Sequence, residues 1–188
     1  MRLLLASESP RRRELLKQLT SDFAVEAAVV DEIKSGSMEP SEIAAHNAGL
    51  KAKAVATLHP DVWVLGADTV VALENKCYGK PRDLEEAADF LRELSGRTHK
   101  VISAISLQRS GENIQHDLVV ETLVTFRSLS EETIREYLAK VPVLDKAGAY
   151  GIQEHGGMLV ESVNGEVENV IGLPVAALRK LLESLKII

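Results

Sequence analysis

The sequence predicts a mixed α/β sheet flanked by helices, and three observations lead to this fold class. Apolar runs typical of buried strands are interspersed with segments whose apolar residues recur at helical spacing. Strand-like and helix-like segments do not alternate strictly, and two strand-like runs are joined by a short turn, as in a hairpin. The 188 residues have 45% hydrophobic content, which is enough for a core in one compact domain or two small lobes.

The N-terminal stretch "LLLASESPRRRELLKQL", residues 3–19, predicts a strand, a tight turn and an amphipathic helix. Ser9 is the expected N-cap of this helix and Pro10 its first residue, so the first backbone N–H groups face the preceding loop. A short strand over 25–30 and a polar connector over 31–40 are expected to follow.

The next two elements are a helix and a long buried strand. The helix is expected to follow an N-cap at Ser41 and to end at "HPD", with Lys51 on its inward stripe. The run over 62–81 begins as a continuous apolar segment broken by Gly66 and Asp68. It therefore predicts buried strand structure with an irregularity at that break.

Two further helices enclose a predicted hairpin. Asp83 and Glu86 resemble a capping box at the start of the first helix, and Ser95 and Gly96 close it. The segments "HKVISAISLQR" and "HDLVVETLVTF" are the expected hairpin strands, joined by the turn "SGEN". Ser130 is the expected N-cap of the second helix.

The C-terminal part of the chain begins with "VPVLDKAGAYGIQEHGG", whose small residues and glycines predict a loop. Asn164 and Gly165 are expected to form another hairpin turn. Pro174 then opens a terminal helix, whose apolar face consists of Leu178, Leu181, Leu182 and Leu185.

Charge and composition narrow the range of functions. The net charge of −6 argues against a general surface for nucleic acids or membranes, so phosphate would have to be bound by a local cluster of cations. The single cysteine, Cys77, cannot form an internal disulfide, and the five histidines show no spacing typical of metal ligands. The sequence contains no long apolar span, so we expect a cytoplasmic protein.

Three arginines, Arg11 to Arg13, crowd the first turn of the N-terminal helix, where the helix dipole disfavours an exposed cation by about 0.3–1 kcal/mol. Arg12 shares the inward stripe of the helix's leucines, whereas Arg13 points outward. An inward guanidinium is costly unless it is paired, and its planar fork suits phosphate oxygens. The arginines therefore indicate an anion site; the alternative is a set of solvated cations partly neutralised by Glu14.

Asp68 is a second anomaly, because it places a carboxylate between apolar residues of a buried strand. A charge in that position needs a neighbouring cation or Mg²⁺, which would leave the carboxylate able to orient a water molecule. The alternative is a carboxylate satisfied by backbone N–H groups of a turn beside Gly66.

Four other residues are weaker candidates for the same site. Glu32 could hold magnesium together with Asp68, although acids that follow a strand are usually solvated. Lys51 and Lys80 could contact phosphate; alternatively, Lys51 extends along apolar surface toward water and Lys80 belongs to a plain turn. Gln153 supplies an amide in the glycine-rich loop.

Six motifs occur in one order along the chain: "LLLASESPRRRELL", "LGADTVV", "GKPRD", "SGRTHKVISA", "LDKAGAYGIQ" and "NVIGLP". Together they resemble the Maf family of nucleoside triphosphate pyrophosphatases over nearly the whole chain. The forms "SPRR" and "KAGAYGIQ" resemble the branch that acts on dTTP and UTP. The resemblance implies a Maf/inosine-triphosphatase-like α/β fold, with a single domain over 1–188 whose two lobes surround a central cleft.

The resemblance also implies the reaction, which is metal-dependent hydrolysis of a nucleoside triphosphate to its monophosphate and pyrophosphate, with Mg²⁺ or Mn²⁺ as the cofactor. Asp68 matches the family's proposed proton acceptor, and Arg11, Thr69 and Gln153 match positions associated with substrate choice. The positions that resemble phosphate or metal contacts are Ser7, Arg12, Glu32, Lys51 and Lys80. A homodimer is further implied.

Two rival functions would use the same residues. One is a pyrophosphatase for modified nucleotides, with the same phosphate clamp and a different base pocket. The other is a nucleotide-binding regulator of septum formation, in which binding carries the biological role. A scaffold without a catalytic site would leave the inward Arg12, the buried Asp68 and the glycine-rich loop unrelated to one another.

Overall fold

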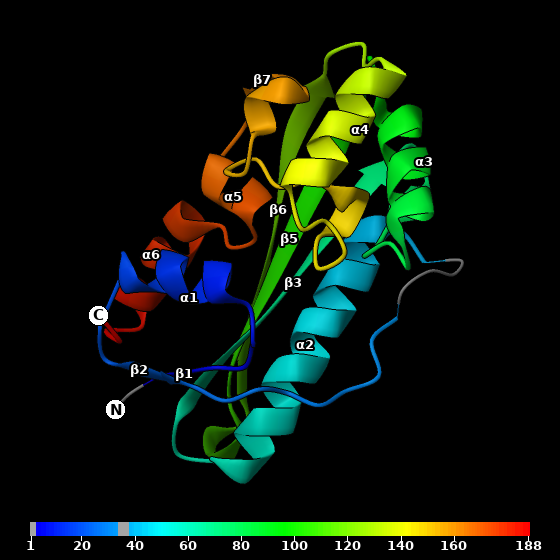
Figure 1. The fold of residues 1–188 in the computed structure, drawn as a ribbon. Helices are drawn as coiled ribbons and strands as arrows, with labels where there is room; N and C mark the ends of the chain where they lie inside the picture. The colour runs from blue at the N-terminus through cyan, green and yellow to red at the C-terminus, as the bar shows by residue number, and fades with distance from the viewer. Residues whose placement is uncertain (1–2, 34–37) are drawn as a thin grey trace.

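The computed structural model describes residues 3–33 and 38–188, and the strands in these ranges form one seven-stranded mixed sheet (Figure 1). The strands are β1 (Leu3–Leu5), β2 (Phe23–Val25), β3 (Trp63–Leu73), β4 (Lys76–Tyr78), β5 (Thr98–Arg109), β6 (Ile114–Phe126) and β7 (Val160–Asn164). Six of them follow the order β2-β1-β3-β5-β6-β7, and β4 pairs with β3. The two β1 pairings are parallel and the others are antiparallel, which confirms the predicted mixed α/β class.

Among the residues that the structure describes, six α-helices cover the sheet, together with short 3₁₀ helices at 110–112, 147–149 and 156–158. The α-helices are α1 (Pro10–Lys17), α2 (Pro40–Leu58), α3 (Leu84–Leu94), α4 (Glu131–Lys140), α5 (Val167–Ile171) and α6 (Val175–Ser184). Within the described ranges, none of them combines the length and the apolar character that a membrane crossing requires.

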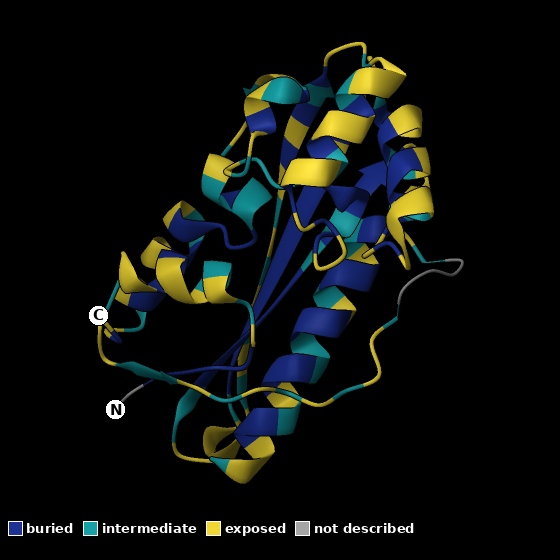
Figure 2. Ribbon diagram, in the orientation of Figure 1, coloured by how far each residue is buried: buried dark blue, intermediate teal, exposed yellow. Residues whose placement is uncertain are grey.

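The two faces of the sheet are covered differently. On one face, α2 packs along the even-numbered residues of β3, such as Val64, Val70 and Ala72. On the other face, α1 and α6 pack at one end of the strands, and α3 and α4 pack at the other end. Figure 2 shows the central strands and the inward side of α2 as buried.

The middle of β3 has a strand neighbour on one side only. β1 pairs with β3 from Trp63 to Leu65, and β4 pairs with it from Val71 to Leu73. Between these pairings, residues 66–70 pair with β5, and no described strand lies along their other edge. This open edge leaves room for side chains and backbone groups to face a ligand.

The predicted irregularity at Gly66 and Asp68 is wrong, because the pairing of β3 with β5 runs unbroken from Val64 to Ala72. Gly66 instead permits close helix packing: a Cβ atom there would lie 2.6 Å from the backbone nitrogen of Ala52 and would also overlap the carbonyl of Ala48. The backbone of α2 therefore rests directly on β3.

Three predicted N-caps are confirmed. Ser9, Asp83 and Ser130 each accept a hydrogen bond from the backbone N–H group three residues further along the chain. The predicted cap at Ser41 is wrong, because α2 begins at Pro40, with Glu39 as its N-cap. Proline is favoured at the first helical position, since its missing N–H group is not needed there.

Two connections also differ from the predictions. The strand expected over 25–30 is β2, which ends at Val25, because its pairing is limited to the three residues of β1. Asn164 and Gly165 do not form a hairpin turn but lead from β7 into α5. Residues 34–37 of the predicted connector lie outside the described residues.

Candidate active site

A cleft of about 1040 Å³ opens at the unpaired edge of β3. It brings together residues from distant parts of the chain, among them α1, α2, β3 and the loop after α4. Of the nine residues singled out in the sequence, the eight that line this cleft are Arg11, Arg12, Glu32, Lys51, Asp68, Thr69, Lys80 and Gln153. Ser7 lies behind the wall, where its hydroxyl contacts Arg12.

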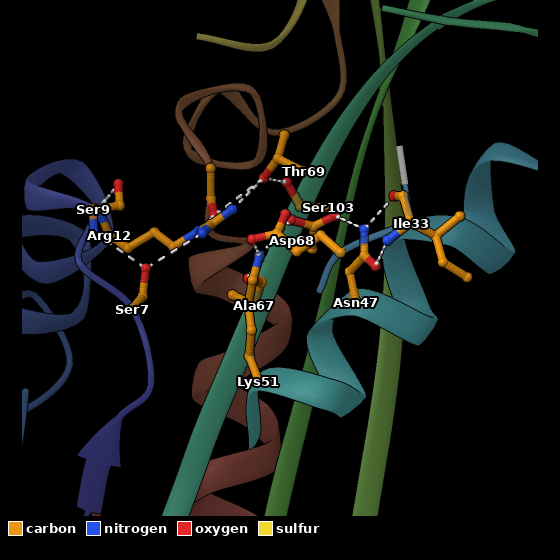
Figure 3. A network of polar contacts seen from close by, with 12 residues as sticks. Ser7, Ser9, Arg12, Ile33, Asn47, Lys51, Ala67, Asp68, Thr69 and Ser103 are labelled. Carbon is orange, nitrogen blue, oxygen red and sulfur yellow. Dashed lines mark hydrogen bonds and ion pairs between the residues drawn. The ribbon is translucent and has the colours of Figure 1, made fainter. Parts of the chain in front are cut away.

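The carboxylate of Asp68 is held from α2 by two side chains on the same helical stripe. Lys51 Nζ lies 2.8 Å from Asp68 Oδ1, and Asn47 Nδ2 donates to Asp68 Oδ2 at 3.1 Å (Figure 3). All three residues are at most 8% exposed. Residues 47 and 51 are one helical turn apart, and the tight contact at Gly66 places that turn against the strand. The carboxylate is therefore satisfied by helix side chains, not by turn N–H groups.

Glu32 joins this cluster through Asn47. The amide of Asn47 accepts from the backbone N–H of Ile33 and donates to its carbonyl, both at 2.9 Å. This pair of bonds fixes the segment beside α2, and Glu32 Oε1 lies 3.1 Å from Lys51 Nζ. Two carboxylates, those of Glu32 and Asp68, thus contact one ammonium group.

Arg12 approaches the strand from the opposite face. Its Nη2 donates to Thr69 Oγ1 at 3.1 Å, its Nε donates to the carbonyl of Gly172 at 2.9 Å, and its Nη1 donates to Ser7 Oγ at 3.4 Å. Thr69 Oγ1 also shares a hydrogen bond of 2.9 Å with Ser103 on β5. The inward direction predicted for Arg12 is confirmed, whereas Arg13 is exposed.

The charge of Arg12 persists at neutral pH in this enclosed position. Burial lowers the pKa of its guanidinium from the ordinary value, and the nearby carboxylates of Asp68 and Glu32 oppose that effect. Because the ordinary pKa of arginine lies far above neutrality, the group stays protonated. Arg12 and Lys51 therefore bring two positive charges to the adjacent residues Thr69 and Asp68, one from each face of the sheet (Figure 3).

The remaining candidates lie nearer the mouth of the cleft. Arg11 Nη1 forms a 3.0 Å ion pair with Asp145 Oδ2, which connects α1 to the loop after α4. Gln153 is exposed in the same loop, and Lys80 is exposed after β4. Their side chains face the cleft from its outer part.

Some residues of the site were not predicted as functional. Asn47 carried a usable signal, because it is a polar residue four positions before Lys51 on the inward stripe of its helix. Ser103 and Asp145 show no such signal in the sequence, because their partners, Thr69 and Arg11, lie far away along the chain. Only the strand register and the packing of α1 bring these pairs together.

Tyr150 forms part of the cleft wall and is tied to the core behind it. Its hydroxyl lies 2.8 Å from His99 Nε2, and the Tyr150 and His99 rings each pack edge-on against Phe126, with ring centroids 4.8 Å apart in both pairs. Burial lowers the pKa of His99 to about 4 and raises that of Tyr150. His99 is therefore neutral at physiological pH, and it anchors the base of the glycine-rich loop.

The family model for Maf-like proteins matches residues 2–185, so the chain belongs to the Maf family. A dTTP/UTP pyrophosphatase of Akkermansia muciniphila is 50% identical over 183 residues, which are 97% of this chain and 96% of that protein. The dTTP/UTP pyrophosphatase of Myxococcus xanthus is 49% identical, with 96% of this chain and 91% of that protein covered. That of Bacillus velezensis is 44% identical, with 99% and 97% covered. The resemblance found in the motifs is thus confirmed.

Two solved structures share the fold. The Ham1 protein of Staphylococcus aureus has a TM-score of 0.58 at 17% identity, and the match covers 98% of this chain and 100% of that one. A HAM1 protein from Coxiella burnetii has a TM-score of 0.50 at 15% identity, with 98% and 99% covered. These likenesses concern the fold alone, and they agree with the class predicted from the sequence.

The neutral state of His99 predicts a loss of stability in acid. Between pH about 6.5 and about 4, the unfolded chain binds a proton at this histidine and the native protein does not. The free energy of unfolding should therefore fall as the pH decreases, with this residue contributing up to about 1.4 kcal/mol per pH unit. Urea unfolding across this range measures the slope, and His99→Phe should reduce it. An equal slope in the variant would contradict the assignment.

Proposed function

We propose that this protein is a nucleoside triphosphate pyrophosphatase that hydrolyses dTTP and UTP to the monophosphate and pyrophosphate. The observation that carries the proposal is the convergence of two cations, the buried Lys51 and the partly buried Arg12, beside the buried carboxylate of Asp68 in one large cleft. Cations suit a triphosphate, and a positioned carboxylate suits a general base. The names and the near-full-length coverage of the relatives support the same reaction.

The triphosphate would be bound by groups from three parts of the chain. Arg12 has five N–H donors, and three of them are used by Ser7, Thr69 and Gly172, which leaves two for phosphate oxygens. The N-terminus of α1, with its N-cap at Ser9, offers backbone N–H groups to the same region of the cleft. Lys51 and the exposed Lys80 would neutralise further phosphate charge.

A divalent cation fits the acidic side of the cleft. Glu32 and Asp68 both contact Lys51 Nζ, so their carboxylates face a common position beside a positive charge. Mg²⁺ is usually held by one or two carboxylates together with substrate phosphates. When bound there, Mg²⁺ or Mn²⁺ would offset the charge of the phosphate oxygens.

The described residues contain no group of three or more His, Cys, Asp or Glu side chains arranged to hold a metal. Glu32 and Asp68 would thus supply only part of a coordination shell, and phosphate oxygens of the nucleotide would have to supply more. Metal binding and nucleotide binding should for that reason strengthen each other.

Asp68 is the proposed general base. A carboxylate has about four acceptor sites, and the bonds from Lys51 and Asn47 leave others free for a water molecule. Asp68 would accept a proton from that water as its oxygen attacks the α-phosphorus. The bond from the α-phosphorus to the bridging oxygen then breaks, and pyrophosphate leaves with the two distal phosphoryl groups.

Base selection is assigned to the mouth of the cleft. The amide of Gln153 can donate to O4 and accept from N3–H of uracil or thymine, whereas cytosine presents the reverse pattern. Thr69 and Arg11 match the family positions associated with substrate choice, and both line the same cleft. An amide can rotate to exchange its two ends, so its neighbours must hold it in one orientation.

The whole chain is proposed to act as one domain over 1–188 with two lobes, because a single sheet carries the cores on both sides of the cleft. The partner that the site calls for is a free nucleotide, and the net charge of −6 disfavours nucleic acids and membranes. A cytoplasmic location and a homodimer stay predictions.

The role of Asp68 predicts a specific loss in Asp68→Asn. Turnover of UTP should fall by about 10²- to 10⁴-fold, since the amide cannot accept the proton, while nucleotide binding is largely retained. Pyrophosphate release and equilibrium binding measure the two effects separately. Asp117→Asn is a matched control, because Asp117 is exposed on β6.

Unimpaired turnover in Asp68→Asn would refute the assignment of Asp68 as the general base. A cellular effect that persists without hydrolysis would favour the nucleotide-binding regulator.

The proposed substrate is tested by a panel of nucleotides with Mg²⁺ or Mn²⁺. We expect pyrophosphate release from dTTP and UTP at much higher kcat/KM than from CTP, because Gln153 held in one orientation complements only the first two bases. Equal kcat/KM for all three would remove the base-selection argument. Hydrolysis confined to modified nucleotides would keep the mechanism and change the substrate class.

A further inference from the structure

We infer that Lys146 is a positioning residue for base selection. Its buried ammonium group holds Arg11 and the loop of Gln153 in place. The inference rests on the proposed function and names a residue for which the motifs predicted no role. Lys146 is 4% exposed, although it lies in a loop at the edge of the cleft. A buried lysine is costly unless its charge is paired, so its contacts indicate its role.

The ammonium group of Lys146 contacts three oxygen atoms of its own loop. It donates to the carbonyl of Pro142 at 2.6 Å and to Asp145 Oδ1 at 2.8 Å, and it lies 3.3 Å from Glu154 Oε2. Pro142 and Glu154 lie at the two ends of the segment that carries Lys146 and Gln153. One cation thus ties both ends of the loop together.

The loop is shaped to accept the stem of this lysine. A Cβ atom at Gly151 would lie 3.0 Å from Lys146 Cε and 3.3 Å from Lys146 Cδ, so the backbone passes directly over the side chain. The N–H group of Gly151 is in turn bound by the hydroxyl of Tyr137 at 3.0 Å. The backbone that leads to Gln153 therefore rests on the aliphatic part of Lys146.

Both groups proposed to recognise the base are connected to this cation. On one side, Glu154 is the next residue after Gln153, and its carboxylate contacts Lys146 Nζ. On the other side, Asp145 is shared: Oδ1 accepts from Lys146, and Oδ2 accepts from Arg11 Nη1 at 3.0 Å. Arg11 also donates to the carbonyl of Asp145 at 3.4 Å.

The charge of Asp145 agrees with this bridging position. Burial tends to raise the pKa of its carboxyl, but the hydrogen bonds from Lys146 and Arg11 bring it below its ordinary value. The carboxylate is ionised at neutral pH and can hold two cations at once. This three-member bridge therefore connects Arg11 on α1 with the loop that carries Gln153.

Loss of the ammonium group should therefore affect the choice of base more than the binding of phosphate. Arg12, Lys51 and Asp68 are fixed by α1, α2 and β3 through contacts that do not involve Lys146. Gln153 depends on its loop for orientation, and a freely rotating amide accepts both base patterns. A merely structural role would instead reduce the hydrolysis of all nucleotides by the same factor.

The test compares Lys146→Met with the wild-type protein. Methionine keeps much of the aliphatic stem and removes the charge. The ratio of kcat/KM for UTP to that for CTP should fall by on the order of 10- to 100-fold, as expected when a positioned group is displaced by about 1 Å. Inhibition by inorganic pyrophosphate, which probes the phosphate side alone, should be unchanged. Lys140→Met is the matched control, because Lys140 is exposed on α4 and pairs with Glu136.

A second variant keeps the test decisive if Lys146→Met does not fold. Asp145→Asn leaves Lys146 bound to Pro142 and beside Glu154 but weakens the link to Arg11, so the UTP-to-CTP ratio should fall in the same direction. An unchanged ratio, or equal losses on both nucleotides, would overturn the inference while leaving the proposed function intact. A wild-type protein that hydrolyses UTP and CTP equally would contradict the proposed base selection itself.

Discussion

The ion pair between Lys51 and Asp68 is the contact on which the rest of the site depends. Both groups are buried, and a buried charge is costly unless it is paired and hydrogen-bonded, so Lys51 and Asp68 stabilise each other, with Glu32 as a second partner of the ammonium group. The pair exists because α2 lies directly on β3, and Gly66 permits that approach. The same helical turn supplies Asn47, which holds both Asp68 and the segment that carries Glu32.

The open edge of β3 makes the ion pair between Lys51 and Asp68 accessible to a ligand. Successive residues of a strand point to opposite faces, so Asp68 faces α2 and Thr69 faces α1. Lys51 and Arg12 reach these two residues from opposite sides of the sheet, where β1 has ended and β4 has not yet begun. A ligand at this edge meets both cations and the carboxylate together. Neither layer of helices could provide this combination alone.

Much of this arrangement could be predicted from periodicity. The helical stripes placed Arg12 and Lys51 inward, and the apolar flanks of Asp68 marked it as buried. The pairs between Thr69 and Ser103 and between Arg11 and Asp145 could not be predicted, because they depend on strand register and on the packing of distant elements. The irregularity predicted at Gly66 is wrong for a related reason: a glycine within a strand indicates either a bulge or a close neighbour, and only the position of α2 distinguishes the two.

The most direct test of the account is the position of bond cleavage in UTP, since Asp68 is assigned to activate a water molecule for attack at the α-phosphorus. Hydrolysis in H₂¹⁸O, followed by mass spectrometry of both products, locates the incorporated oxygen. The account predicts the label in UMP and none in pyrophosphate at early times. Label in pyrophosphate, with unlabelled UMP, would mean attack at the β-phosphorus and would contradict the assigned role of Asp68.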